Sequence, residues 1–205
     1  MSNPIIFNED QLDCLGELMN ISYGSATAAI SEILNSFATL NIPSIKIFEA
    51  SKIKEYLNDN SIQNQEQYIA SQILNGGISG ENIFLIDIIS AKNLALEFGL
   101  EENEINNNEL SDIVLEITNI LSSATIGRLA SDLETTVSFE PPTIQKIDSF
   151  DKLDDKYMKD YEQVIVISTI LEFEDQKIKA QLILLTIDSS ILWLRDSIDK
   201  ILEDL

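Results

Sequence analysis

The sequence predicts an α+β fold: a single pseudo-two-fold domain, built from two tandem helix–strand–hairpin–helix repeats that share an antiparallel sheet flanked by long helices. Two observations predict this fold. Long segments whose apolar residues recur every three to four positions lie between strand-length apolar segments. The chain also matches itself when residue n is written above residue n+99. The expected repeats run from about 8 to 100 and from about 107 to 205, inside one domain of residues 1–205.

Each repeat begins with a long helix, expected at 9–37 and 108–134, with Asn, Asp or Glu near its start to cap the free N–H groups. The apolar residues of each helix form one stripe, which is expected to be buried. In the first helix the stripe is Leu12, Leu15, Met19, Tyr23, Ala26, Ile30, Ile33, Leu34 and Phe37. In the second helix it is Leu110, Val114, Ile117, Leu121 and Ala124.

The rest of each repeat follows a proline. Pro43 precedes "IKIFEA" and Pro142 precedes "IQKIDS", since a proline at the first residue of a strand sacrifices no ladder hydrogen bond. A short polar helix or loop is expected next, at 51–60 and 150–161. Two hairpin strands and a closing helix complete each repeat, with strands at 66–74, 82–88, 162–174 and 177–187 and helices at 90–99 and 189–202. The self-match needs no gap here and places 83–88 over 182–187.

The composition excludes several kinds of chemistry. The chain has no histidine and one cysteine, Cys14, which excludes imidazole bases, Ser-His or Cys-His nucleophiles, an internal disulfide and a cysteine-based zinc site. Cys14 is expected to be inert, because no base or basic group lies near it in the sequence. No metal site is expected: the acidic residues Asp151, Asp154 and Asp155 lack the spacing of a calcium loop and indicate a solvated loop.

Charge and hydropathy also limit the partners. A net charge of −22 disfavours binding to nucleic acid or to an anionic membrane. No apolar run has the length of a membrane span, and the start of the chain lacks the features of a signal peptide. A cytoplasmic protein without membrane insertion is therefore expected.

Two polar pairs recur at one spacing on the two long helices. Glu17 and Asn20 lie on the first helix, and Glu116 and Asn119 on the second. By the helical period both pairs face outward, opposite the apolar stripe. For one pair, a solvated helix face is the ordinary explanation. Gly24 weakens it, because a glycine inside a helix costs about 0.5–1 kcal/mol relative to alanine and is worth keeping where something approaches the backbone closely.

The pattern Glu-x-x-Asn, followed after 22 residues by Pro, resembles the signature of the CheC/CheX/FliY family of response-regulator phosphatases. It occurs twice here, as Glu17, Asn20 and Pro43 and as Glu116, Asn119 and Pro142. The segment "NISYGSATAAIS" is also similar to a run typical of the family, with Ser22 where a glycine is common. The length, the duplication and the two motifs resemble CheC in particular, while FliY carries a further flagellar-switch domain.

The resemblance implies hydrolysis of the aspartyl phosphate of a CheY-like response regulator, into whose active site the helix inserts. Asn20 and Asn119 are then expected to position the attacking water, and Glu17 and Glu116 to pair with a lysine of the partner. No cofactor of the chain's own is implied, and Mg²⁺ is expected on the response regulator.

The resemblance also implies roles for the small residues and the prolines. Gly24 and the aligned Ser123 are expected to let the partner approach, while Pro43 and Pro142 are structural. The alternative function is an adaptor that binds CheD, the receptor deamidase, and regulates receptor modification with little catalysis of its own. A purely structural flagellar component is a third, weaker interpretation.

Overall fold

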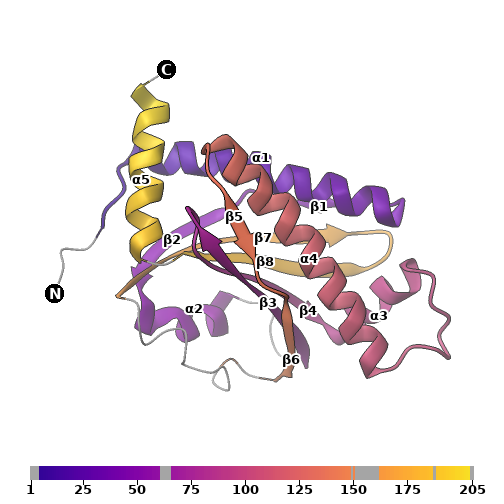
Figure 1. Cartoon of the computed structure of the whole chain (residues 1–205). Helices are drawn as coiled ribbons and strands as arrows, with labels where there is room; N and C mark the ends of the chain where they lie inside the picture. The colour runs from indigo at the N-terminus through magenta and orange to yellow at the C-terminus, as the bar shows by residue number, and fades with distance from the viewer. Residues whose placement is uncertain (1–4, 61–65, 149, 151–161, 187, 204–205) are drawn as a thin grey trace.

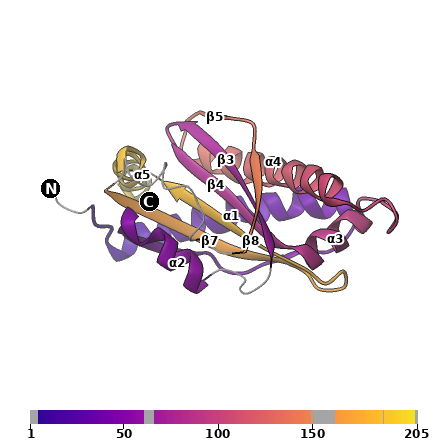
Figure 2. The same cartoon turned by 90° about the horizontal axis from the view of Figure 1, so that it is seen from below.

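The computed structural model describes residues 5–60, 66–148, 150, 162–186 and 188–203. Two long helices, α1 (Glu9–Leu34) and α4 (Asn107–Asp132), lie side by side over one face of a curved antiparallel sheet (Figure 1). The short helix α2 (Ile53–Asn60) lies on the opposite face, as the view from below shows (Figure 2). The predicted α+β fold is confirmed.

Asparagine side chains begin both long helices within one residue of the predicted positions. Oδ1 of Asn8 accepts a hydrogen bond from the backbone N–H of Gln11, and the Gln11 side chain accepts one from the N–H of Asn8, which is a capping box. Oδ1 of Asn106 accepts from the N–H groups two and three residues further on. α1 ends earlier than predicted, because Asn35 adopts a left-handed conformation with a φ of 47° and caps the helix.

The early end of α1 changes two of the predicted core residues. Phe37 lies beyond the cap and is 82% exposed, and Ile33, at the edge of the stripe, is 49% exposed, so the predicted burial of both is wrong. The helical period does not apply to Phe37 once the helix has ended. The other members of both stripes lie in the core, apart from the half-buried Leu12 and Ala124.

In the described part of the chain, eight strands form one sheet in the order β1-β7-β8-β4-β3-β5, with β2 also paired to β7 and β6 also paired to β3. All pairings are antiparallel. The predicted strands are β2 (Ser44–Glu49), β3 (Gln67–Gly76), β4 (Gly80–Asp87), β6 (Thr143–Ile147), β7 (Gln163–Phe173) and β8 (Ile178–Thr186). The very short β1 (Thr39–Leu40) and β5 (Val137–Phe139) were not predicted.

The remaining helices close each half. α3 (Ile88–Glu97) and α5 (Asp188–Glu203) follow β4 and β8, and a 3₁₀ turn at Ala50–Lys52 leads into α2. The side chain of Gln11 donates to Oδ1 of Asp199 over 2.6 Å and so ties α1 to α5. Apart from Phe150, the segment 150–161, expected to correspond to α2, lies outside the described residues, as does the acidic loop with Asp151, Asp154 and Asp155.

Two backbone-to-serine hydrogen bonds relate the halves. The N–H of Ser79 donates to Oγ of Ser190 over 2.8 Å, and the N–H of Lys179 donates to Oγ of Ser90 over 3.1 Å. These bonds are equivalent at an offset of 100, not 99. Strand pairing aligns Leu74 of β3 with Leu171 of β7, an offset of 97, so the gap-free offset is wrong from the hairpin strands onward. The predicted pair of repeats in one domain stays a prediction, which this symmetric pair of bonds favours.

Among the described residues, α4 is the one helix long and apolar enough to cross a membrane by length and composition. However, 56% of its most apolar window is buried inside the protein. Its apolar side chains pack against the sheet, α1 and α3, as in a core helix of a soluble protein. This helix is therefore weak support for a membrane span.

Candidate functional site

The first polar pair lies on the outer face of α1. Glu17 and Asn20 are both exposed, and neither side chain makes a hydrogen bond or ion pair with another described residue. Gly24 follows one turn later and is also exposed. A Cβ built on Gly24 would meet no heavy atom within 4 Å, so packing inside the chain does not require a glycine here. The first site is an open helix face with a free carboxylate and a free amide.

The second polar pair lies on the outer face of α4. Glu116, Asn119 and Ser123 are exposed, as predicted. The Ser123 hydroxyl donates to the backbone carbonyls of Asn119 and Ile120 and is therefore engaged with its own helix. Unlike Asn20, Asn119 has a side-chain partner: its Oδ1 accepts a hydrogen bond of 3.1 Å from Nε2 of Gln72. The outward placement of both pairs is confirmed, while the role of each residue stays a prediction.

Gln72 is a site residue that the sequence reasoning missed. It lies on β3, whose side chains at 68, 70, 72 and 74 face the long helices, and it is the one amide in that row. An amide in a row of core positions is the signal that could have identified it, because a buried amide needs hydrogen-bond partners.

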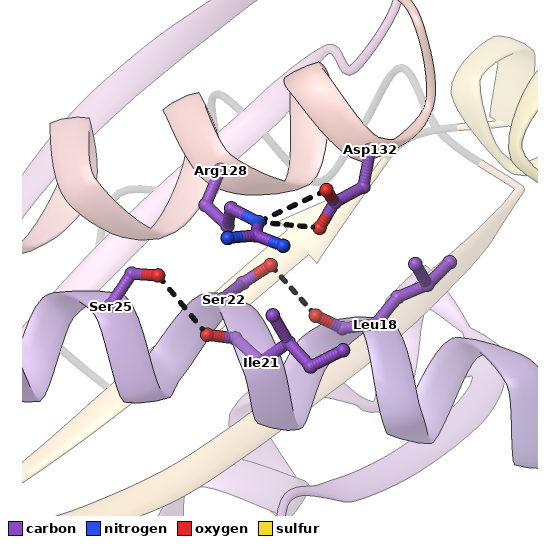
Figure 3. Close-up of polar contacts among 6 residues, drawn as sticks. All are labelled: Leu18, Ile21, Ser22, Ser25, Arg128 and Asp132. Atoms are coloured by element: carbon purple, nitrogen blue, oxygen red, sulfur yellow. Dashed lines mark hydrogen bonds and ion pairs between the residues drawn. The ribbon is translucent and has the colours of Figure 1, made fainter.

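Figure 3 shows the contact between α1 and α4 beside the first site. The hydroxyl of Ser22 donates to the Leu18 carbonyl over 2.7 Å, and the hydroxyl of Ser25 donates to the Ile21 carbonyl over 3.3 Å. Arg128 reaches from α4 towards these residues. Ser22 is fully buried, so its small side chain lets the helices approach, and its bond to the helix backbone removes the cost of burying a hydroxyl.

The guanidinium of Arg128 is held by its own helix. It forms an ion pair of 2.8 Å with Asp132, one turn further on, and this hydrogen bond raises the pKa of Arg128. The pair is exposed to solvent and therefore adds little to stability. It places a positive charge between the two helices in a chain that is otherwise strongly acidic.

The two prolines and the cysteine lie in half-buried positions. Pro43 and Pro142 are half-buried and stand directly before the first residues of β2 and β6, which is the structural place predicted for them. Cys14 is half-buried, and burial raises the pKa of its thiol. A raised pKa leaves less thiolate at neutral pH, in keeping with an inert cysteine.

Metal-binding side chains do not gather in the part of the chain that the structure describes. No group of three or more Cys, Asp or Glu residues there lies close enough to hold an ion. The groups that the two outer helix faces offer to a partner are therefore carboxylates and amides, which suit ion pairing and the positioning of water.

The family model described as "Chemotaxis phosphatase CheX" matches residues 68–166, a stretch that contains Gln72, Glu116, Asn119 and Pro142. The "Flagellar motor switch phosphatase FliY" of Bacillus subtilis (strain 168) is 24% identical to the chain over 166 residues. This alignment covers 78% of the chain and 42% of the Bacillus protein, so the chain spans less than half of that relative's length.

Solved structures share the fold over nearly the whole chain. FliY from Thermotoga maritima superposes with a TM-score of 0.75 at 20% identity, covering 96% of this chain and 99% of that one. The middle domain of FliM from H. pylori superposes with a TM-score of 0.59 at 11% identity, covering 93% and 99%. Because proteins of different names share this fold, the fold alone does not assign an activity. Together with the repeated Glu/Asn motif, however, the family-model match and the FliY relative make the chain similar to the chemotaxis phosphatases of the CheC/CheX/FliY family.

Proposed function

We propose that the chain is a phosphatase that hydrolyses the aspartyl phosphate of a CheY-like response regulator. The observation that carries this proposal is the pair of exposed Glu/Asn sites on the outer faces of two long helices, in a chain that is similar to chemotaxis phosphatases. Each helix face is open for a partner to dock on, and both present the same two groups one turn apart.

The proposed reaction asks little of the phosphatase beyond positioning. A water oxygen attacks phosphorus, the bond between phosphorus and the aspartyl oxygen breaks, and the aspartate carboxylate and inorganic phosphate are released. Holding the water in line converts a chance encounter into an oriented reaction. The amides of Asn20 and Asn119 can accept a hydrogen bond from that water and donate another, and they bring no negative charge close to the phosphoryl group.

The glutamates are proposed to align the two proteins. Glu17 and Glu116 are exposed and have no partner among the described residues, so each carboxylate is free to form an ion pair with a lysine of the response regulator. Gly24 supports this docking, since its missing side chain leaves the helix backbone open beside Asn20. The divalent metal that the resemblance implies belongs to the response regulator.

The wider setting is part of the same proposal. A cytoplasmic location fits a partner that is itself a diffusible response regulator. The chain's two halves are proposed to be repeats, each supplying one site. The matching family model is named CheX and the curated relative is named FliY, so the CheC subtype stays a prediction, and no observation favours the CheD adaptor as the main function.

The proposal is tested by phosphorylating the organism's CheY-like regulators with a small-molecule phosphodonor and following phosphate release. Wild type is compared with Asn20→Ala, Asn119→Ala and the double variant. Asn108→Ala, an exposed asparagine in the first turn of α4, is the control. Acceleration that disappears in the double variant and survives in the control supports the proposal. The same rate of phosphate release in all variants would argue against the Glu/Asn sites. The CheD adaptor would then remain as the alternative function, and a binding assay with CheD would test it.

A further inference from the structure

We propose that Gln72 is a positioning residue for Asn119, which it holds in one orientation for the attacking water. The inference rests on the proposed function and deepens it. It concerns the second site only and adds a buried residue from the sheet to a site otherwise built on one helix face.

The contact is buried on one side and open on the other. Gln72 is 1% exposed, whereas Asn119 is exposed. Nε2 of Gln72 donates to Oδ1 of Asn119 over 3.1 Å and to the backbone carbonyl of Glu140 over 2.9 Å. Each N–H of the Gln72 amide group therefore has one acceptor. The exposed side chain of Asn119 is therefore held by a hydrogen bond from the buried side chain of Gln72.

The arrangement determines which way the Asn119 amide points. A backbone carbonyl only accepts hydrogen bonds, so the NH₂ group of Gln72, not its oxygen, must face Glu140. The same NH₂ group faces Asn119, which must therefore turn its oxygen towards Gln72. The NH₂ group of Asn119 then points away from the sheet, and its oxygen keeps one lone pair for a further donor such as water.

A neighbouring amide holds the same helix without touching Asn119. Asn82 of β4 is the cross-strand partner of Gln72, and its Nδ2 donates to Oγ of Ser122 over 2.6 Å. The two amides thus contact α4 at adjacent turns and restrain both its rotation and its position along its axis. Asn82 is the natural control for Gln72, because it binds the helix but not the proposed catalytic side chain.

The first half has no amide at the equivalent positions. Thr169 of β7 corresponds to Gln72, because its hydroxyl donates to the carbonyl of Asn41 as Gln72 donates to that of Glu140, and Leu182, its cross-strand partner in β8, corresponds to Asn82. Both residues are buried, and Asn20 has no side-chain partner among the described residues. The anchored amide is therefore a property of the second site alone.

The polar pair is not explained by packing. Oε1 of Gln72 and Oδ1 of Asn82 are buried and have no hydrogen-bond partner in the described part of the chain. A buried carbonyl oxygen without a donor is costly, and the first half avoids that cost, because Thr169 bonds the equivalent backbone carbonyl with a hydroxyl and Leu182 is apolar. Gln72 differs from Thr169 in that its NH₂ group also reaches the long helix, and the group that it orients there is Asn119.

The test uses the full chain with Asn20→Ala, so that the second site alone reports. Into it are introduced Gln72→Leu, Gln72→Met and the control Asn82→Leu, and kcat and KM are measured with the phosphorylated response regulator. We expect the Gln72 variants to lose about tenfold in kcat with KM unchanged. Without its anchor, the Asn119 amide should position the water poorly, while the response regulator docks as before. Asn82→Leu should keep kcat within about twofold. The Met variant serves if the Leu variant does not fold.

Equal kcat in the Gln72 variants and their parent would overturn the inference, and so would an equal loss in Asn82→Leu, which would indicate general loosening of α4. Failure of the proposed function looks different, because the wild type would then not accelerate phosphate release either. In that case NMR of the Asn119 side-chain NH₂ group decides. Unchanged resonances in Gln72→Met would contradict the anchor, and a shift towards random-coil values with averaged rotamers would support it.

Discussion

Asn119 accepts a hydrogen bond from the buried amide of Gln72, whereas Asn20, at the equivalent position of the other long helix, has no partner in the described part of the chain. The two sites therefore present the same residue types, but the side chain of Asn119 is held by a hydrogen bond and the side chain of Asn20 is not. The difference makes the two asparagines distinguishable by stability as well as by activity.

Asn119→Ala is expected to lower the free energy of unfolding by about 1 kcal/mol, because it leaves one N–H of the buried Gln72 without an acceptor. Asn20→Ala is expected to leave stability unchanged or raise it by a few tenths of a kcal/mol, since it loses no bond and alanine favours the helix. Urea denaturation measures both. Equal effects in the two variants would argue against the Gln72 contact.

Gly24→Ala is expected to separate stability from function. Nothing lies within 4 Å of the added Cβ, so the helix should gain about 0.5–1 kcal/mol of stability. In an Asn119→Ala background, dephosphorylation should nevertheless slow, because the added methyl group lies where the response regulator approaches α1. Gly127→Ala is the matched control, because a Cβ at Gly127 on α4 also meets no heavy atom within 4 Å. It should raise the free energy of unfolding by a similar amount without slowing dephosphorylation. A Gly24→Ala protein with undiminished rate would exclude close approach at this point.

Ser90→Ala and Ser190→Ala are expected to destabilise the protein by similar amounts, about 1–2 kcal/mol each. Each serine accepts the N–H of a residue in or next to a hairpin turn, Ser79 or Lys179, and the symmetric loss tests the offset of 100 in this part of the halves. Thermal unfolding gives the comparison. Ser189→Ala, on the exposed side of α5, should be neutral, and a matching loss there would show that the serine contacts are not the cause.

Cys14 is expected to react slowly with thiol reagents. Burial raises its pKa, so at pH 8 the folded protein contains less thiolate than a free cysteine would, and the reaction rate should be lower and should rise on unfolding in urea. Ellman's reagent measures the rate. Labelling of the folded protein as fast as of a model peptide would contradict the half-buried placement of the thiol.

Periodicity in the sequence was enough to predict the long helices and the outward direction of their Glu/Asn pairs, since a core stripe fixes the opposite face of a helix. It could not predict β1 and β5, because strands of two or three residues carry no measurable alternation. Nor could it detect that the offset between the halves is 97 in β3 and β7 and 100 in β4 and β8. The apolar runs of β4 and β8 are buried on both faces, so shifting one against the other by a residue barely changes the match.

The site was predictable only as far as single helices define it. Glu17, Asn20, Glu116 and Asn119 follow from the helical period, whereas Gln72 comes from a strand 47 residues before Asn119. Its contact depends on how α4 lies on the sheet, which no local pattern encodes. Phe37 illustrates the same limit, because the left-handed cap at Asn35 ended the period two residues before it.

The most direct test of the central claim is the rate at which phosphate leaves a phosphorylated CheY-like regulator in the presence of the Asn20→Ala/Asn119→Ala double variant. Two outward Glu/Asn pairs that position water predict that this rate falls to that of the regulator alone, while the Asn108→Ala control remains as fast as wild type. A double variant that accelerates phosphate release as much as wild type would contradict the account.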